Sequence, residues 1–328
     1  MPTNLPPEYF DAEERFRDAK SPQEKIVCLE ELLSTVPKHK GTDKLRADLR
    51  RKLSKLKAGL ETAKKTGRHK SVYHIEREGP VQVLVIGAPN VGKSALVAAL
   101  THATPKVSEY PFTTWTPAPG MMAVRDIHIQ LVDTPPLSEE HIEPELFNLV
   151  RSADFLLLVV DLQSRPLVQI DSVIALLDTH RIALEGTRAD PAKSQYLAVI
   201  PCLVLANKCD DEAWDEEFAV LRELIGERWP LLPVSAASHR NLDRLGEILF
   251  ERLELMRVYC KLPHKDADMG APFVLKKGGT VLDFAGKVHK DFVEGLTAAR
   301  VWGPGVHDGQ HVGRDHVLYD GDIVELHV

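Results

Sequence analysis

Cysteine is scarce in this sequence, and the cysteines that are present stand far apart along the chain: Cys28, Cys202, Cys209 and Cys260. No two of them form a Cys-x-x-Cys pair, and none has a histidine at the spacing of a zinc-ligand set. The sequence therefore offers neither a disulfide framework nor a zinc site, and we expect reduced thiols with structural roles.

Long apolar runs are also missing. The longest one, residues 197–206, ends at Asn207 and is far too short to cross a bilayer. Residues 1–17 are polar and acidic and do not resemble a signal peptide. We therefore expect a cytoplasmic protein without a membrane partner. Its 328 residues, 44% hydrophobic and 27% charged, suffice for a full-sized core and one or two small modules, so we expect several domains.

The formal net charge of −7 conceals an uneven distribution. Residues 38–70 contain thirteen Lys or Arg and three acidic residues, a net charge of +10, which leaves −17 for the rest of the chain. Leucines recur there at helical spacing, as do apolar residues between 26 and 33, and residues 36–41 interrupt the pattern, so residues 8–65 predict a helical hairpin. Its basic side chains either contact nucleic-acid phosphate or form an ordinary solvated face, and charge alone does not separate these interpretations.

A glycine-rich turn lies between an apolar run, residues 81–86, and a helix-forming stretch, residues 95–100. Strand, turn and helix in this order are the context in which G-x-x-x-x-G-K-S predicts a phosphate-binding loop rather than an incidental turn. Backbone N–H groups can then surround an oligophosphate, the lysine places a cation on the outer phosphates, and the serine hydroxyl can bind Mg2+. The residues of this loop are Gly87, Ala88, Pro89, Asn90, Val91, Gly92, Lys93 and Ser94.

Strands and helices alternate downstream of this loop. Helices are predicted over residues 144–151, 167–179, 212–225 and 242–256, and strands over residues 121–124, 128–132, 155–161, 200–206 and 231–234. This order predicts an α/β fold, a doubly wound and mostly parallel sheet that binds a mononucleotide at the carboxyl ends of its strands. The polar residues 185–195 are expected to form a surface loop.

The string NKCD at residues 207–210 directly follows a predicted buried strand. The Asp210 carboxylate can accept hydrogen bonds from the ring N–H and the exocyclic amine of guanine, a donor pair that adenine lacks, so guanine is the predicted base. Asn207 is expected to hold the loops together, and the stem of Lys208 to cover one face of the base. Three residues after the next strand can offer N–H groups to the guanine carbonyl oxygen: Ser235, Ala236 and Ala237.

Two further segments of the sequence contain predicted metal ligands. Asp133 ends a predicted strand, where a carboxylate is expected to hold Mg2+ through water. In residues 110–114 (YPFTT), between the first helix and the second strand, a threonine hydroxyl can reach the metal when a γ-phosphate is bound. Thr114 is the first candidate and Thr113 the second.

From residue 257 the sequence changes to short strands and Gly-rich turns. Strands over residues 272–275, 296–302 and 322–328, with a helix over residues 281–289, suggest a ubiquitin-like β-grasp. Eight basic and ten acidic residues between positions 261 and 325 give this module no electrostatic footprint of its own.

Taken in order, these motifs resemble the guanine-nucleotide motifs of the translation-factor-like GTPases, and YPFTT is similar to the corresponding string of the Obg superfamily. Within that superfamily the chain resembles the Drg family, the developmentally regulated GTP-binding proteins, because its basic N-terminal helices are similar to theirs and its end is similar to their TGS domain. The strings that carry the TGS likeness are VLKKG at 274–278, HKDF at 289–292, VWG at 301–303 and VGRDHVL at 312–318.

The resemblance implies three domains: a basic helical segment (residues 1–78), a G domain (79–256) and a TGS domain (257–328). It implies binding of GTP and GDP with Mg2+. Drg proteins insert a further domain in the G domain, but only 74 positions separate Asp133 from Asn207 here, which is too few for it.

Two positions depart from the pattern of active GTPases. Pro136 stands where the family has a glycine whose N–H meets the γ-phosphate, and proline has no N–H, so weak sensing of GTP against GDP and slow hydrolysis are expected. Leu137 stands where Ras-like enzymes place a glutamine that orients the attacking water. Catalysis would then rest on Lys93, Thr114 and Asn90, and in related GTPases this asparagine helps to hold a K+ near the phosphates.

Two functions of different classes fit the sequence. The first is a slowly hydrolysing GTPase switch that engages the ribosome or another RNA through residues 38–70 and the TGS domain. The second, which Pro136 favours, is a nucleotide-gated scaffold with little turnover that recruits a protein partner through the TGS domain. A third, an ATP-using P-loop enzyme, would require Asp210 to be incidental.

Overall fold

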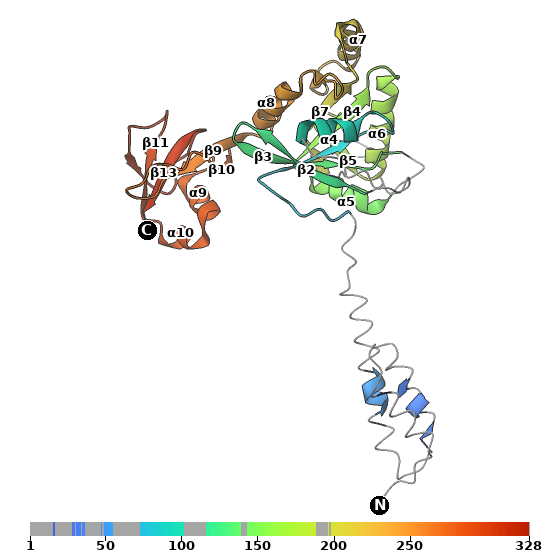
Figure 1. Cartoon of the computed structure of the whole chain (residues 1–328), viewed down its shortest axis with the longest axis horizontal. Helices are drawn as coiled ribbons and strands as arrows, with labels where there is room; N and C mark the ends of the chain where they lie inside the picture. Colours follow the sequence, from blue (N-terminus) through green and yellow to red (C-terminus); the bar gives the residue numbers. More distant parts are fainter. Residues whose placement is uncertain are drawn as a thin grey trace, which may run out of the picture. The chain divides into compact units, whose positions relative to one another are not determined.

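The computed structural model of the chain describes residues 73–101, 116–138, 143–187, 196 and 198–327, together with residues 16, 28–29, 31–33, 35–36, 47 and 49–54 near the N-terminus. The chain divides into two compact units, residues 1–71 and residues 72–328 (Figure 1). In the first unit the described residues are helical except Val36, and a small buried cluster contains Leu29, Leu32 and Leu49 from both predicted helices. Most of the basic residues 38–70 lie outside the described residues.

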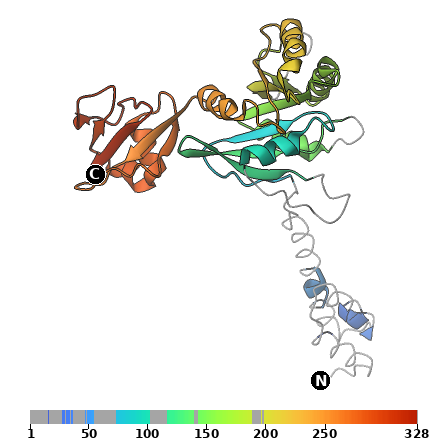
Figure 2. The ribbon, with the colours of Figure 1, turned by 45° about the horizontal axis from the view of Figure 1, so that its top comes forward.

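A β-sheet with its helices forms the larger part of the second unit (Figure 2). The sheet has six strands in the order β2-β3-β1-β4-β7-β8. Only the β2–β3 pair is antiparallel, so the predicted fold class is confirmed. The elements of this part are β1 (Gln82–Ile86), α4 (Lys93–Thr101), β2 (Ala118–Val124), β3 (Ile127–Asp133), α5 (Pro144–Ser152), β4 (Phe155–Asp161), α6 (Pro166–Thr179), β5 (Ile182–Leu184), β6 (Ala198–Ile200), β7 (Cys202–Asn207), a 3-10 helix (Glu212–Trp214), α7 (Asp215–Ile225), β8 (Leu231–Pro233) and α8 (Leu242–Arg252).

The register of the strands brings their carboxyl ends to one edge of the sheet. Val85 of β1 pairs with Asp133 of β3, and Asp161 of β4 pairs with Asn207 of β7. β1 and β4 are buried along their whole length, because helices cover both faces of a parallel sheet and exclude water from its central strands. The polar residues that follow these strands therefore meet at the same edge.

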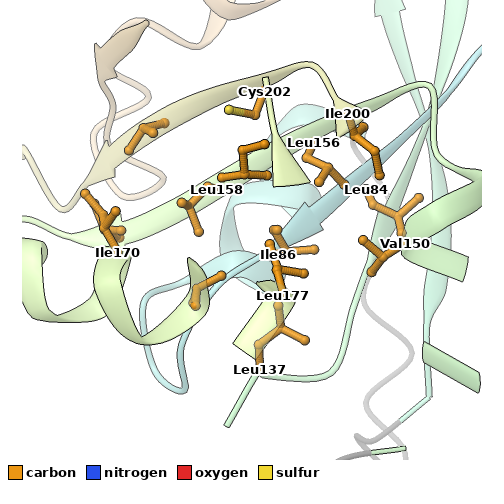
Figure 3. Close-up of a cluster of buried hydrophobic side chains, with 14 of the residues drawn as sticks. Leu84, Ile86, Leu137, Val150, Leu156, Leu158, Ile170, Leu177, Ile200 and Cys202 are labelled. Atoms are coloured by element: carbon orange, nitrogen blue, oxygen red, sulfur yellow. The ribbon is translucent and has the colours of Figure 1, made fainter. Parts of the chain in front are cut away.

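The helices divide between the two faces. Helices α5, α6 and α7 pack on one face, where Leu84, Leu156 and Leu177 belong to one buried cluster (Figure 3). Helices α4 and α8 cover the other face in a second cluster. Leu137, which comes from the segment after β3, is 5% exposed and lies in the first cluster. This segment is therefore anchored in the core beside the predicted nucleotide site.

The C-terminal part of this unit contains a five-stranded sheet in the order β10-β9-β13-β11-β12, of which only β9 and β13 run parallel. Phe284 of its first helix is fully buried in the core beneath the sheet. Thr280 and Asp283 form a capping box at the start of that helix. The elements are β9 (Leu255–Cys260), β10 (Phe273–Lys276), α9 (Val281–Val288), α10 (Lys290–Gly295), β11 (Ala298–Trp302), β12 (Gln310–Val312) and β13 (Asp322–His327).

A network of ionic hydrogen bonds joins the two sheets. Arg257 of β9 donates from Nη1 to Asp126 in the β2–β3 turn, at 2.8 Å, and from Nη2 to Asp320 beside β13, at 2.9 Å. In the same turn, the guanidinium of Arg125 lies 4.1 Å from the ring centroid of Phe250 on α8. Because these side chains are partly shielded from water, the contacts are stronger than ordinary surface ion pairs.

Two predicted elements have different bounds in the structure. The helix predicted over residues 242–256 ends at Arg252, because Glu254 adopts a left-handed conformation (φ 52°) and the next residues form β9. The strand predicted over residues 200–206 is broken at Pro201, which has no N–H for a ladder. The residues before it form β6, which pairs only with β5, and those after it form β7.

The four cysteines are free. Among the described residues, no helix has both the length and the apolar character needed to span a bilayer.

Candidate functional site

The predicted phosphate loop, residues 87–94, connects β1 to α4 at the carboxyl edge of the sheet. Gly87 and Gly92 both have positive φ angles. A Cβ atom on Gly87 would lie 2.3 Å from the carbonyl oxygen of Val159, and one on Gly92 would lie 2.4 Å from Nδ2 of Asn207. Both glycines are therefore required, since neighbouring strands and loops approach the backbone too closely for any side chain.

Lys93, the first residue of α4, folds back over this loop. Its Nζ donates to the carbonyl oxygens of Gly87, at 3.1 Å, and Ala88, at 2.9 Å. The side chain is buried, and this burial lowers the pKa of Lys93 to about 8, although the nearby Asp133 carboxylate acts in the opposite direction. Asn90, in contrast, is exposed and left-handed, with φ 62°.

Asp133 ends β3 beside the start of α4. The Ser94 hydroxyl donates to its Oδ2 at 2.5 Å, whereas its Oδ1 is buried without a hydrogen-bond partner among the described residues. Burial raises the pKa of Asp133, and the Ser94 hydrogen bond and the Lys93 charge oppose this rise. An unpartnered carboxylate oxygen beside a serine hydroxyl is a donor set that suits Mg2+.

In the part of the chain that the structure describes, no group of three or more His, Cys, Asp or Glu side chains could hold a metal by itself. A Mg2+ ion at Ser94 and Asp133 would therefore take further ligands from phosphate and water, which is how Mg2+ commonly binds in proteins.

Asn207 connects the loops of the site. Its Nδ2 donates to the carbonyl oxygen of Val91 in the phosphate loop at 2.8 Å, and its Oδ1 accepts from the N–H of Ala236 at 3.3 Å. The side chain is 2% exposed. One buried amide thus bridges the loops that follow β1, β7 and β8, which is the arrangement expected for Asn207 from the sequence.

The other polar residues of the NKCD string are also held in place. Lys208 forms an ion pair with Asp161 at 2.6 Å, while Asp210 accepts from the Ser235 hydroxyl at 2.5 Å. The Ser235 oxygen in turn accepts from the N–H of Ala237 at 3.2 Å. The loop after β8 is therefore tied to Asp210 through Ser235, and the carboxylate is fixed before any ligand arrives.

Three residues of the site were missed by the sequence analysis. Gln163 donates to the carbonyl oxygen of Lys208 at 2.9 Å, and Asp161 forms the ion pair with Lys208. Arg240 donates to the carbonyl oxygen of Asp211 at 2.8 Å and to the carboxylate of Asp215. Asp161, like Asp133, is the polar last residue of a predicted buried strand. This position at the carboxyl edge of the sheet could have identified Asp161 as a site residue.

The segment after β3 has no free backbone N–H between residues 134 and 137. The Thr134 N–H donates to Val85 at 3.3 Å, and the Leu137 N–H donates to Gly87 at 3.0 Å. Pro135 and Pro136 have none. The predicted metal ligands Thr113 and Thr114 lie outside the described residues.

Two known protein families match the second unit, one in its larger part and one in its C-terminal part. The 50S ribosome-binding GTPase family matches residues 82–208, and the TGS domain family matches residues 261–328.

Three relatives are similar over nearly the whole chain. An uncharacterized GTP-binding protein of Methanocaldococcus jannaschii is 32% identical over 368 aligned positions, which cover 94% of this chain and 93% of the relative. Ribosome-interacting GTPase 1 of Saccharomyces cerevisiae is 25% identical and covers 92% of this chain and 98% of its own. Developmentally-regulated G-protein 2 of Arabidopsis thaliana is 27% identical, with coverages of 92% and 90%.

Two solved structures share the fold. The YchF GTPase of Schizosaccharomyces pombe superimposes with a TM-score of 0.55 at 14% identity, covering 77% of this chain and 99% of its own. A GTP binding protein of Pyrococcus horikoshii gives a TM-score of 0.50 at 20% identity, with coverages of 75% and 99%.

The buried amine of Lys93 predicts a pH-dependent cost in stability. Its pKa is about 8 in the folded chain against 10.5 as the ordinary value, so between these pH values the unfolded chain binds more protons at this group. The cost is complete below pH 8 and disappears as the pH rises toward 10.5. The free energy of unfolding of Lys93→Met minus that of the wild type should therefore fall by up to about 3 kcal/mol between neutral and alkaline pH, because only the wild type is relieved of this cost.

Urea unfolding without nucleotide at both ends of this pH range measures the difference. Lys265→Met, at an exposed lysine, is the matched control and should show no such trend. A difference between Lys93→Met and the wild type that stays constant with pH would contradict the prediction.

Proposed function

Because this chain belongs to the Drg family of GTP-binding proteins in the Obg superfamily, with a C-terminal TGS domain, we propose that it is a cytoplasmic GTPase switch that hydrolyses GTP slowly and acts on the ribosome or another RNA. The observation that carries the proposal is the pair of Asn207 hydrogen bonds, which join the phosphate loop to the loops expected to select the base.

In this proposal, residues 87–94 surround the phosphates with backbone N–H groups and the Lys93 ammonium. Asp210 accepts from the ring N–H and the exocyclic amine of guanine, and the N–H groups of residues 235–237 face its carbonyl oxygen. The Lys208 stem covers the base while Asp161 holds its ammonium. The site thereby rejects adenine, which would cover the Asp210 carboxylate without offering it a donor pair.

Ser94, Asp133 and, when GTP is bound, Thr114 would hold Mg2+, which supplies positive charge to the phosphate oxygens. Lys93 adds a fixed cation, and Asn90, at the exposed tip of the loop, is the candidate to hold a K+. Leu137 is buried in the core and cannot orient water, so these charges have to provide the stabilisation of the transition state.

The proposed ribosomal partner is supported by the relatives and by charge. One yeast relative is named a ribosome-interacting GTPase, and the matched family is described as 50S ribosome-binding. In this chain Arg50, Arg51 and Lys52 are consecutive, helical and exposed. Such a cluster can neutralise RNA phosphates, and the TGS domain would add a second contact.

A nucleotide-gated scaffold with little turnover is the alternative. It is favoured by the segment after β3, where the Leu137 N–H is bonded to Gly87 and Pro136 offers none. A γ-phosphate would gain no backbone bond there, so this segment would respond little to the exchange of GDP for GTP. Single-turnover hydrolysis measured with and without ribosomes separates the two functions.

Asp210→Asn should change the base that is preferred. The amide can still accept from the Ser235 hydroxyl, so the loop stays intact, but it cannot accept from both donors of guanine. Loss of a hydrogen bond to a charged group predicts about 10- to 100-fold weaker GDP binding, together with tighter binding of XDP, whose carbonyl can accept from the amide. Calorimetric titration with GDP and XDP measures both changes. Asp171→Asn, on an exposed part of α6, is the control, and unchanged GDP affinity in Asp210→Asn would refute the assignment.

Pro136→Gly should restore discrimination between the two nucleotide states. The wild type is expected to bind a non-hydrolysable GTP analogue and GDP with similar affinity, because residue 136 has no N–H. The glycine supplies this donor, and a charge-assisted hydrogen bond predicts roughly tenfold or tighter analogue binding with little change for GDP. Stopped-flow titration with fluorescent nucleotides measures both. Pro135→Gly controls for added flexibility, and an equal gain in that variant would contradict the assignment.

Reversing the charges of Arg50, Arg51 and Lys52 to glutamate should weaken binding to purified ribosomal particles and flatten its dependence on salt by about one unit of slope per lost phosphate contact. Cosedimentation over a series of KCl concentrations measures this. A variant that reverses Arg181, Arg222 and Arg244, exposed basic residues of the second unit, should bind as the wild type does. Identical binding by both variants would refute the electrostatic contact.

A further inference from the structure

An apolar groove of about 540 Å3 lies between α6 and α7. Leu162 and Leu221 form its buried floor, at 4% and 2% exposure. Val168, Val220 and Leu224 line its open side and are 58%, 56% and 60% exposed. Large apolar side chains that gather in this way on a surface mark a contact site more often than isolated ones do.

The spacing along α7 fits one extended contact. Glu217, Val220, Leu221 and Leu224 follow each other at intervals of three, one and three residues, so they occupy one face of the helix. The opposite wall comes from the first turn of α6. The groove thus runs between the two helices and has the form that receives a third helix.

The rim of the groove is mainly acidic. Glu216 and Glu217 line it, and neither forms an ion pair with any other residue that the structure describes. Asp215, in the same first turn of α7, is already paired with Arg240. Arg165 is the basic residue among the lining side chains. Unpaired carboxylates beside an apolar floor attract lysine or arginine side chains that flank an apolar stripe.

We propose that this groove docks an amphipathic helix of a partner protein, with apolar residues at i, i+3, i+4 and i+7 and basic residues beside them. RNA does not fit, because its phosphates would face carboxylates and its polar backbone an apolar floor. A second copy presenting the same surface fits less well than a basic helix, because Arg165 of each copy could neutralise only one of the two carboxylates, Glu216 and Glu217, that the other copy brings to the contact.

The floor of the groove is connected to the predicted base-binding loop, so a docked helix can affect that loop. Leu162 directly follows Asp161, which pairs with Lys208, and precedes Gln163, which donates to the Lys208 carbonyl oxygen. A helix that packs on Leu162 would therefore shift or stiffen the two residues that hold Lys208. The rate at which GDP is released should then change. This consequence rests on the proposed nucleotide site, whereas docking itself does not.

A synthetic helix of about 18 residues tests the docking. It carries leucine at i, i+3, i+4 and i+7, lysine beside the leucines and alanine elsewhere, and a second peptide has glutamate in place of each lysine. Fluorescence anisotropy with the full chain should show binding of the lysine peptide and at least about tenfold weaker binding of the glutamate peptide. Hydrogen exchange should show protection confined to α6, α7 and residues 161–165. No binding at about 1 mM peptide, equal binding of both peptides, or protection elsewhere would overturn the proposal.

Variants separate the groove from other surfaces. Leu224→Ser and Val220→Ser should each weaken the lysine peptide about tenfold, because each removes apolar area that the helix would bury. Glu216→Lys with Glu217→Lys should invert the preference between the two peptides. The controls are Val199→Ser, at an exposed apolar residue outside the groove, and Glu223→Lys, on α7 but not lining it. Control variants that weaken binding equally would overturn the proposal, as would a dimer of the full chain that Leu224→Ser dissociates in sedimentation.

The release of labelled GDP is measured in the same samples. Protection of the groove without a change in release refutes only the coupling. Failure of GDP to bind refutes the proposed function and leaves docking to be judged by hydrogen exchange alone.

Discussion

The buried side chain of Asn207 is the interaction on which the site depends. It donates to Val91 in one loop and accepts from Ala236 in another, and it fits only because Gly92 has no Cβ. An amide buried at this depth has to keep both hydrogen bonds, since an unsatisfied polar group costs about 1–3 kcal/mol. The three loops are therefore held at fixed distances by one residue, and their order on the sheet follows from strand register.

Two charged side chains near this amide are buried at a cost in folding free energy. Lys93 is buried with a lowered pKa, and Asp133, beside Ser94, has one oxygen that finds no hydrogen-bond partner among the residues that the structure describes. Each is costly in the folded chain alone, and each suits a ligand of opposite charge: phosphate for the ammonium and Mg2+ for the carboxylate. A ligand at a hundredfold excess over its dissociation constant stabilises the folded state by about 2.7 kcal/mol. Binding energy can thus offset what the site costs in stability.

The elements that could be predicted from the sequence are those whose own residues show a clear pattern of apolar and polar positions. The strand over residues 155–161 was predicted with its observed bounds, because a fully buried strand is a continuous apolar run between polar ends. The start of β9 was missed because residues 253–256 continue an apolar helical pattern, and only the pairing of Leu255 and Met256 with β10 makes the end of this stretch a strand. Similarly, the motifs identified Lys208 and Asp210, whereas Asp161, Gln163 and Arg240 belong to no motif and reach the site through strand register and loop packing.

The proposed function requires these loops to form one pocket that is specific for guanine nucleotides. Calorimetric titration of the purified chain with Mg2+ and either GDP or ADP tests it most directly. We expect GDP to bind tighter than ADP by a factor on the order of 10^4, because adenine lacks the donors that Asp210 requires. Equal affinity for the two nucleotides, or no binding of either, would contradict it.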